Sequence, residues 1–156
     1  MKASLDTNAR KNRGGDVMSK IVSNYFDKQK IKYEKEVTTQ DLEKRFHLDL
    51  SPITNSGQAS KRFDFVVENK GVIYGIEVNF YSSGGSKLNE TARSYKEIAL
   101  ASRNIKNFKF AWITDGAGWK TAKKNLKETF DVLPELFNIR DLNDGRFLEL
   151  LKYESI

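Results

Sequence analysis

Hydrophobic residues recur along the chain at two spacings, one typical of amphipathic helices and one typical of strands. The helical spacing is clearest in residues 15–29, where an apolar stripe follows Gly14–Gly15 and Asp16 is the predicted N-cap. Further helices are predicted at 39–48, 88–103, 119–130 and 141–151. Strands are predicted at 31–37, 62–68, 72–81 and 107–114, with a last short strand at 136–139.

Turn-forming residues separate these elements. Asn69–Lys70–Gly71 lies between two strand-like runs and predicts a β-hairpin. Residues 50–60 and 82–86 are predicted loops, and Asp115–Gly116–Ala117–Gly118 breaks a strand before a helix. The order is mixed α/β, and no repeat or linker divides it, so we expect a single domain over residues 1–156.

Composition narrows the function classes. The 156 residues contain 27 Lys and Arg against 21 Asp and Glu, and the resulting charge of +6 favours a polyanionic partner. A basic arm is expected at about residues 1–13. No apolar run is long enough to span a bilayer, and the N-terminus has no signal-peptide core. The absence of cysteine and the single histidine, His47, argue against a zinc site, a cysteine nucleophile or a histidine-based triad, and a cytoplasmic location is the simplest expectation.

Two acids interrupt otherwise apolar strands, namely Asp64 and Glu77. A carboxylate there is costly unless it faces water, a cation or a metal. If the hairpin turn has two or four residues, we expect Asp64 opposite Gly75 and diagonal to Glu77 on the same face, with Gly75 leaving room beside Asp64. Two carboxylates and water form the oxygen environment that Mg²⁺ prefers. The alternative is a pair of solvated acids on the outer face of an edge hairpin.

Four segments resemble the catalytic core of the DpnII/MboI-type restriction endonucleases. They are TNARKNRGG at 7–15, RFD at 62–64, IEVNFYSSGGSKLNE at 76–90 and WITDGAGW at 112–119. The resemblance runs in patches from about residue 6 to 130, and its long motifs make it specific.

This resemblance implies a PD-(D/E)xK core, in which helices flank a mixed central sheet, and Mg²⁺-dependent hydrolysis of double-stranded DNA at GATC. It also implies a partner adenine methyltransferase that protects host DNA. Asp64 and Glu77 would be metal ligands assisted by the Val78 carbonyl. Asn79 stands where the general motif has lysine, so it would hold the attacking water while the metal supplies acidity. Ser19 stands where the family often has glutamate.

Residues expected to contact DNA fall into three groups. The loop and the helix start after the second acidic strand are rich in hydrogen-bond donors, and their glycines allow close backbone approach. The following helix presents polar side chains at i, i+4 and i+7, and the basic arm could wrap the duplex. These residues are Ser83, Gly84, Gly85, Ser86 and Lys87; Asn89, Arg93 and Lys96; and Asn8, Arg10, Lys11, Asn12 and Arg13. The alternatives are a solvated helix face and a disordered tail.

Three functions are therefore compared. The leading hypothesis is a restriction enzyme that acts as a homodimer, because a palindromic target is symmetric. The second is a PD-(D/E)xK nuclease of DNA repair or recombination, and the third is a non-catalytic DNA-binding module, which Ser19 favours.

Overall fold

The computed structural model describes the backbone of residues 2–55 and 61–153, and side chains from residue 15 to 152 within those ranges. In chain order, the elements are α1 (Lys2–Lys28), β1 (Tyr33–Thr38), α2 (Thr39–Phe46), α3 (Ser51–Thr54), β2 (Arg62–Asn69), β3 (Val72–Phe80), α4 (Ser86–Ser102), β4 (Phe108–Asp115), the 3₁₀ helix η1 (Ala117–Thr121), α5 (Lys123–Val132), β5 (Leu136–Phe137), α6 (Ile139–Asn143) and α7 (Arg146–Tyr153).

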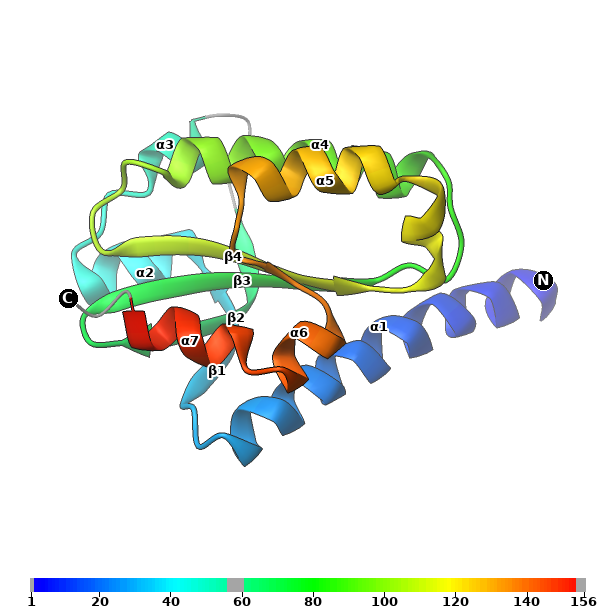
Figure 1. Cartoon of the computed structure of the whole chain (residues 1–156), viewed down its shortest axis with the longest axis horizontal. Helices are drawn as coiled ribbons and strands as arrows, with labels where there is room; N and C mark the ends of the chain where they lie inside the picture. The colour runs from blue at the N-terminus through cyan, green and yellow to red at the C-terminus, as the bar shows by residue number, and fades with distance from the viewer. Residues whose placement is uncertain (1, 56–60, 154–156) are drawn as a thin grey trace.

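A five-stranded sheet in the order β1-β2-β3-β4-β5 forms the centre of the molecule. The first three strands are antiparallel neighbours, while β4 is parallel to β3 and β5 is parallel to β4. A parallel connection needs a crossover, which α4 provides between β3 and β4. The predicted α/β fold with a mixed central sheet flanked by helices is confirmed (Figure 1).

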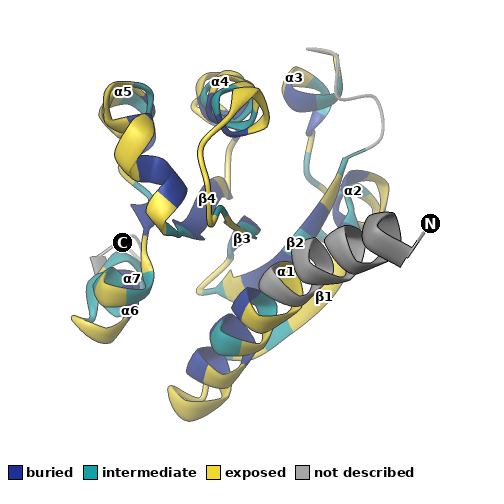
Figure 2. Ribbon diagram, turned by 90° about the vertical axis from the view of Figure 1, so that its right-hand side faces the viewer, coloured by how far each residue is buried: buried dark blue, intermediate teal, exposed yellow. Residues whose placement is uncertain are grey.

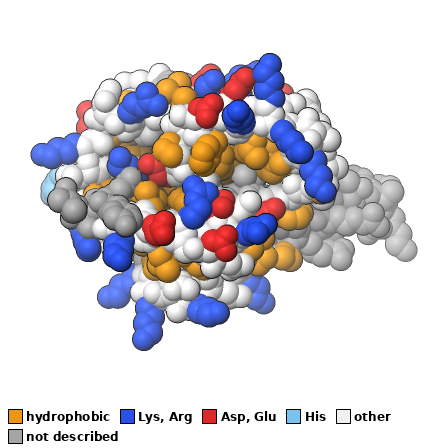
Figure 3. Space-filling model, viewed as in Figure 1, with side chains coloured by type: hydrophobic (Ala, Val, Ile, Leu, Met, Phe, Trp, Pro, Cys, Tyr) orange, Lys and Arg blue, Asp and Glu red, His pale blue; other side chains and the backbone are white. Residues whose placement is uncertain are grey.

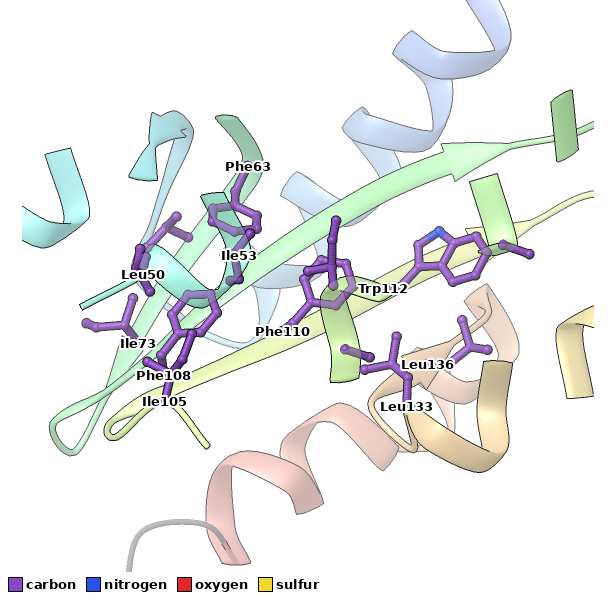
Figure 4. Close-up of a cluster of buried hydrophobic side chains, with 14 of the residues drawn as sticks. Leu50, Ile53, Phe63, Ile73, Ile105, Phe108, Phe110, Trp112, Leu133 and Leu136 are labelled. Carbon is purple, nitrogen blue, oxygen red and sulfur yellow. The ribbon is translucent and has the colours of Figure 1, made fainter. Parts of the chain in front are cut away.

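Helices cover both faces of the sheet (Figures 1 and 2). Beneath α3, α4 and α5 lies an upper core that contains Phe63, Phe108, Phe110 and Trp112 (Figure 4). Between the sheet and α1, α6 and α7 lies a lower core, defined by Met18, Phe26, Phe65, Tyr74 and Phe147. Burial of these large apolar side chains on both faces is the main stabilisation of the three-layer arrangement.

Several predicted boundaries are wrong, among them that of the helix predicted at 119–130, which is the 3₁₀ helix η1 followed by α5. The first helix begins at Lys2 and not at Asp16, so the backbone of residues 2–13, predicted as an arm, belongs to α1. Glycine in an exposed helix costs only about 1 kcal/mol relative to alanine, so Gly14–Gly15 does not end the helix. The predicted loop at 50–60 contains α3, and the helix predicted at 141–151 is two helices, separated at Gly145, whose φ is +85°.

Candidate active site

The hairpin between β2 and β3 has a two-residue turn, Lys70–Gly71, because Asn69 pairs with Val72. Both turn residues have positive φ, 52° and 85°, as a type I′ turn requires. Regular pairing of the two strands ends at Phe65 opposite Ile76, so Asp64 and Glu77 each lie one residue beyond this last pair. The two acids nevertheless meet, since Asp64 acts on the Glu77 carboxyl group through its charge and a hydrogen bond, but the expected place of Asp64 opposite Gly75 is wrong.

Gly75 also has a different role from the one expected. It lies opposite Val66 and not opposite Asp64. A Cβ atom at Gly75 would lie 2.9 Å from the Phe108 ring and 3.0 Å from the Phe63 ring. The missing side chain therefore makes room for upper-core rings and not for Asp64.

Strand β2 departs from regular pairing at Asp64. The register with β3 ends at the Phe65–Ile76 pair, and the register with β1 omits the pair between Glu36, whose φ is 55°, and Asp64. Phe63 and Phe65 would share a face of a regular strand, yet they lie in opposite cores. At this irregular position, the half-buried Asp64 is free to bond to its neighbouring strand with its side chain.

The Asp64 carboxylate bonds to the backbone of β3. Its Oδ2 accepts a hydrogen bond of 2.8 Å from the Val78 N–H. Because the N–H and C=O of one strand residue point to the same neighbour, the Val78 carbonyl also faces the β2 side. Two oxygen atoms that could bind a metal ion, one from the Asp64 carboxylate and one from the Val78 carbonyl, thereby face the same gap between the strands.

Glu77 is buried in the upper layer, with 5% of its surface exposed. Its Oε1 lies 2.5 Å from Lys61 Nζ, and the Tyr95 hydroxyl lies 3.4 Å from its Oε2. Burial raises the pKa of Glu77 to about 8; the Asp64 charge and a hydrogen bond to Asp64 add to this rise, and Lys61 opposes it. The two acids thus converge closely enough to repel, and Glu77 keeps a proton near neutral pH when no other cation is bound.

Asn79 is held from the side of β4. Its Oδ1 accepts hydrogen bonds from Trp112 Nε1 at 3.0 Å and from Thr114 Oγ1 at 2.6 Å. Trp119 Nε1 in turn donates to Thr114 Oγ1 at 2.9 Å. The carbonyl end of the amide is therefore engaged, and the Nδ2 group is the end that remains to donate to a water molecule.

The donor set fits a hard divalent cation. Among the residues that the structure describes, no group of three or more His, Cys, Asp or Glu side chains is placed to hold a metal. Two carboxylates, from Asp64 and Glu77, and the Val78 carbonyl offer only oxygen, and Mg²⁺ normally completes such a set with water. Burial and, after it, the Asp64 charge raise the pKa of Glu77, and a cation between the two acids would relieve their repulsion.

The residues predicted to contact DNA in the loop after β3 are exposed, from Ser83 to Lys87. The loop packs on η1, since a Cβ at Gly84 would clash with Thr121. Gly85 has a φ of +150° and open space where a side chain would be. Close approach of an outside backbone or phosphate is therefore possible at Gly85, whereas Gly84 is required by internal packing.

The polar residues predicted on the next helix do share a face. Asn89, Arg93 and Lys96 line a small groove of about 150 Å³ with residues of α5. Asn89 Oδ1 accepts a 2.7 Å hydrogen bond from Asn125 Nδ2, so this residue is partly engaged inside the protein. The helix face is thus partly covered by α5 and not fully open, and contact with DNA stays a prediction for all three residues.

The side chains of the remaining predicted DNA contacts lie outside the described part of the chain. These residues are Asn8, Arg10, Lys11, Asn12 and Arg13. Their backbone forms part of α1. On the face that carries α5 and α7, Lys and Arg side chains surround a hydrophobic centre and form no continuous basic patch (Figure 3).

Four residues at the site were not predicted for it from the sequence: Lys61, Tyr95, Trp112 and Thr114. Tyr95 was assigned only to an apolar pattern, Trp112 was assigned to an apolar pattern and a family motif without a role of its own, and Lys61 borders a segment assigned to a loop. One feature of the sequence indicated that residues of β4 belong to the site. The motif at 112–119 resembles the same family as the motif at 76–90, which carries Glu77 and Asn79. The structure explains this pairing, because Trp112 and Thr114 support Asn79, and Gly116 and Gly118 pack against the Tyr81–Ser83 backbone.

A mixed five-stranded sheet between helical layers, with an acidic pair on a hairpin at its centre, defines the restriction-endonuclease-like class of α/β proteins. The chain belongs to the DpnII restriction endonuclease family, whose model matches residues 1–149.

Curated relatives are similar over nearly the whole chain. The type II restriction enzyme DpnII of Streptococcus pneumoniae is 56% identical over 142 residues, which cover 88% of this chain and 49% of that enzyme. The type II restriction enzyme MboI of Moraxella bovis is 45% identical, covering 97% of this chain and 51% of that enzyme. The type II restriction enzyme MjaIII of Methanocaldococcus jannaschii is 39% identical, covering 94% and 52%.

The chain spans about half the length of these relatives. No solved structure matches it. Within the described residues, no helix combines the length and apolar character needed to cross a membrane.

Proposed function

We propose that this chain carries the catalytic centre of a type II restriction endonuclease that hydrolyses double-stranded DNA with Mg²⁺ at GATC. The family and the names of the curated relatives support the class of activity. The observation that carries the proposal is the convergence of Asp64 and Glu77 across the β2–β3 hairpin, with Val78 beside them.

Asp64, Glu77 and the Val78 carbonyl would hold the metal. A bound Mg²⁺ supplies Lewis acidity toward the phosphate and lowers the pKa of a coordinated water. Glu77 gives up its proton when the site is loaded, because a divalent charge nearby favours its ionised form. Asn79 directs its Nδ2 group to the attacking water while Trp112 and Thr114 hold its carbonyl end. One water breaks one P–O bond and leaves a phosphate on one end and a hydroxyl on the other.

DNA contact is assigned to the exposed residues 83–87 at the end of the loop after β3 and the start of α4, to Asn89, Arg93 and Lys96 further along α4, and to the polar and basic residues Asn8, Arg10, Lys11, Asn12 and Arg13 of α1. The net charge of +6 supports a polyanionic substrate. A homodimer would place one centre on each strand of a palindromic site, and an adenine methyltransferase would protect the host. The cytoplasmic location expected from the sequence stays a prediction.

The test is digestion of unmethylated plasmid DNA with and without Mg²⁺, repeated with DNA methylated on the adenine of GATC. Discrete bands whose ends map to GATC, absent with EDTA, would support the proposal. Cleavage without discrete bands, or dependent on DNA branches, would favour a repair or recombination nuclease instead. Binding without cleavage at any metal concentration would favour the non-catalytic module.

Asp64→Asn is the matched variant for this assay, and Asp144→Asn is its control, because Asp144 is exposed and belongs to α6's C-terminal cap. Loss of cleavage in the first and wild-type cleavage in the second would link the activity to this site. Full cleavage by Asp64→Asn would refute the assignment.

A further inference from the structure

A half-buried lysine, Lys61, lies beside the acidic pair, although no lysine follows Glu77 on β3. Lys61 Nζ lies 2.5 Å from Glu77 Oε1, and the Lys61 side chain is only 15% exposed. The ammonium also lies 5.4 Å from the centre of the Tyr95 ring and 5.9 Å from that of Phe63. These contacts describe a cation enclosed by the Glu77 carboxyl group and two aromatic faces.

The backbone of Lys61 is fixed at the end of the sheet. Its carbonyl accepts a 2.9 Å hydrogen bond from Thr39 N at the start of α2. The next residue, Arg62, begins β2 and pairs with Thr38. Lys61 is thus attached to the strand that carries Asp64, three residues away, and its side chain reaches over the hairpin toward Glu77.

Asn79 cannot supply positive charge to the reacting atoms. An amide carries no charge, and its Oδ1 is engaged by Trp112 and Thr114. Among the described residues, the cation paired with Glu77 comes from Lys61. Because Lys61 contacts a proposed metal ligand, its ammonium group is close enough to the proposed metal site to be tested for contact with the attacking water or the phosphate.

The geometry points to Lys61 as the residue that supplies, from the start of β2, the positive charge that Asn79 does not supply from β3. In this role, the Lys61 ammonium donates a hydrogen bond to the attacking water or to a non-bridging phosphate oxygen and stabilises the charge that develops there. The inference rests on the proposed nuclease function and adds a catalytic residue to it.

A purely structural role makes a different prediction. If Lys61 only keeps the two acids in place, its removal disperses the ligands and weakens metal binding. If Lys61 acts on the reacting atoms, its removal leaves the ligands in place and deletes a positive charge near the metal, so that metal binding is equal or tighter.

The experiment compares wild type, Lys61→Met and the control Lys106→Met, which changes an exposed lysine before β4. Affinity for Mn²⁺ is measured by electron paramagnetic resonance, and single-turnover cleavage of unmethylated DNA is measured at saturating Mg²⁺. We expect Lys61→Met to bind Mn²⁺ at least as tightly as wild type and to cleave about 100-fold more slowly. Lys106→Met is expected to match wild type in both measurements.

Cleavage at the wild-type rate by Lys61→Met, or weaker Mn²⁺ binding by that variant, would overturn the inference. If Lys61→Met does not fold, Lys61→Gln, which keeps a polar head near Glu77, is judged by the same two results. Failure of the wild-type chain to cleave would refute the proposed function instead, and the Mn²⁺ affinities would still decide whether Lys61 is needed to hold the ligands.

Discussion

Glu77→Gln is expected to raise the stability of the metal-free protein at high pH and to abolish DNA cleavage. In the metal-free protein, burial and the Asp64 charge raise the pKa of Glu77 from 4.5 to about 8. The folded chain therefore binds more protons than the unfolded chain between these two values, and it loses stability as pH rises through that interval. At about 1.4 kcal/mol per pKa unit, the full shift corresponds to about 5 kcal/mol, and structural relaxation reduces this to a few kcal/mol. Glutamine has the same shape and no charge, so the variant avoids this loss.

The assay is thermal unfolding in EDTA at pH 5 and pH 9. Near pH 5, the wild-type glutamate is mostly protonated, so the two proteins should melt at similar temperatures. At pH 9, Glu77→Gln should melt higher by roughly 5–10 °C, since 1 kcal/mol shifts the melting temperature of a chain of this size by about 2–4 °C. With Mg²⁺, the variant should gain no stability and should not cleave DNA. An equal difference in melting temperature at both pH values would refute the argument that Glu77 is a buried acid with a raised pKa.

Three further predictions concern neighbouring residues. Asp64→Asn is expected to abolish cleavage while DNA affinity, measured by fluorescence anisotropy, is kept or increased, because a negative charge near the phosphates is removed; greatly weakened binding would contradict this. Thr114→Val removes a bond to Asn79 and leaves the buried Trp119 N–H without its acceptor, so chemical denaturation should show a loss of about 1–3 kcal/mol; unchanged stability would count against the network. Gly116→Ala should prevent stable folding or lower the melting temperature strongly, because its Cβ would lie 2.0 Å from the Tyr81 carbonyl oxygen at a φ of +120°; a wild-type melting curve would show that this loop rearranges freely.

Much of the fold is predictable from local sequence pattern. Alternating apolar residues mark β2, β3 and β4, and helical spacing marks α4 and the second half of α1. The Lys70–Gly71 turn is encoded by residues that accept positive φ, and it sets the β2–β3 register from which Asp64 and Glu77 were predicted to share a face. The acids were predicted as a pair for this reason, since strand pleat relates two positions once the turn length is known.

Errors arose where local preference competes with tertiary contact. Gly14–Gly15 looked like the start of a helix, yet α1 continues through them to Lys2. The missing side chain at Gly75 was expected to leave space for Asp64, but the rings of Phe63 from β2 and Phe108 from β4 fill that space. The first outcome follows from the small cost of glycine in a helix, and the second depends on rings from other strands.

By itself, the sequence predicted which residues would carry the chemistry, namely two acids on neighbouring strands and an amide in place of a lysine, and it supplied the motifs that identify the family. Only the tertiary structure decided what surrounds them. The irregular pairing at Asp64, the Trp112–Thr114 support of Asn79 and the Lys61 ammonium at Glu77 each join segments separated in the chain. Periodicity describes how one segment presents its faces, whereas a side-chain contact between segments depends on sheet order and on the side-chain volumes packed between the layers.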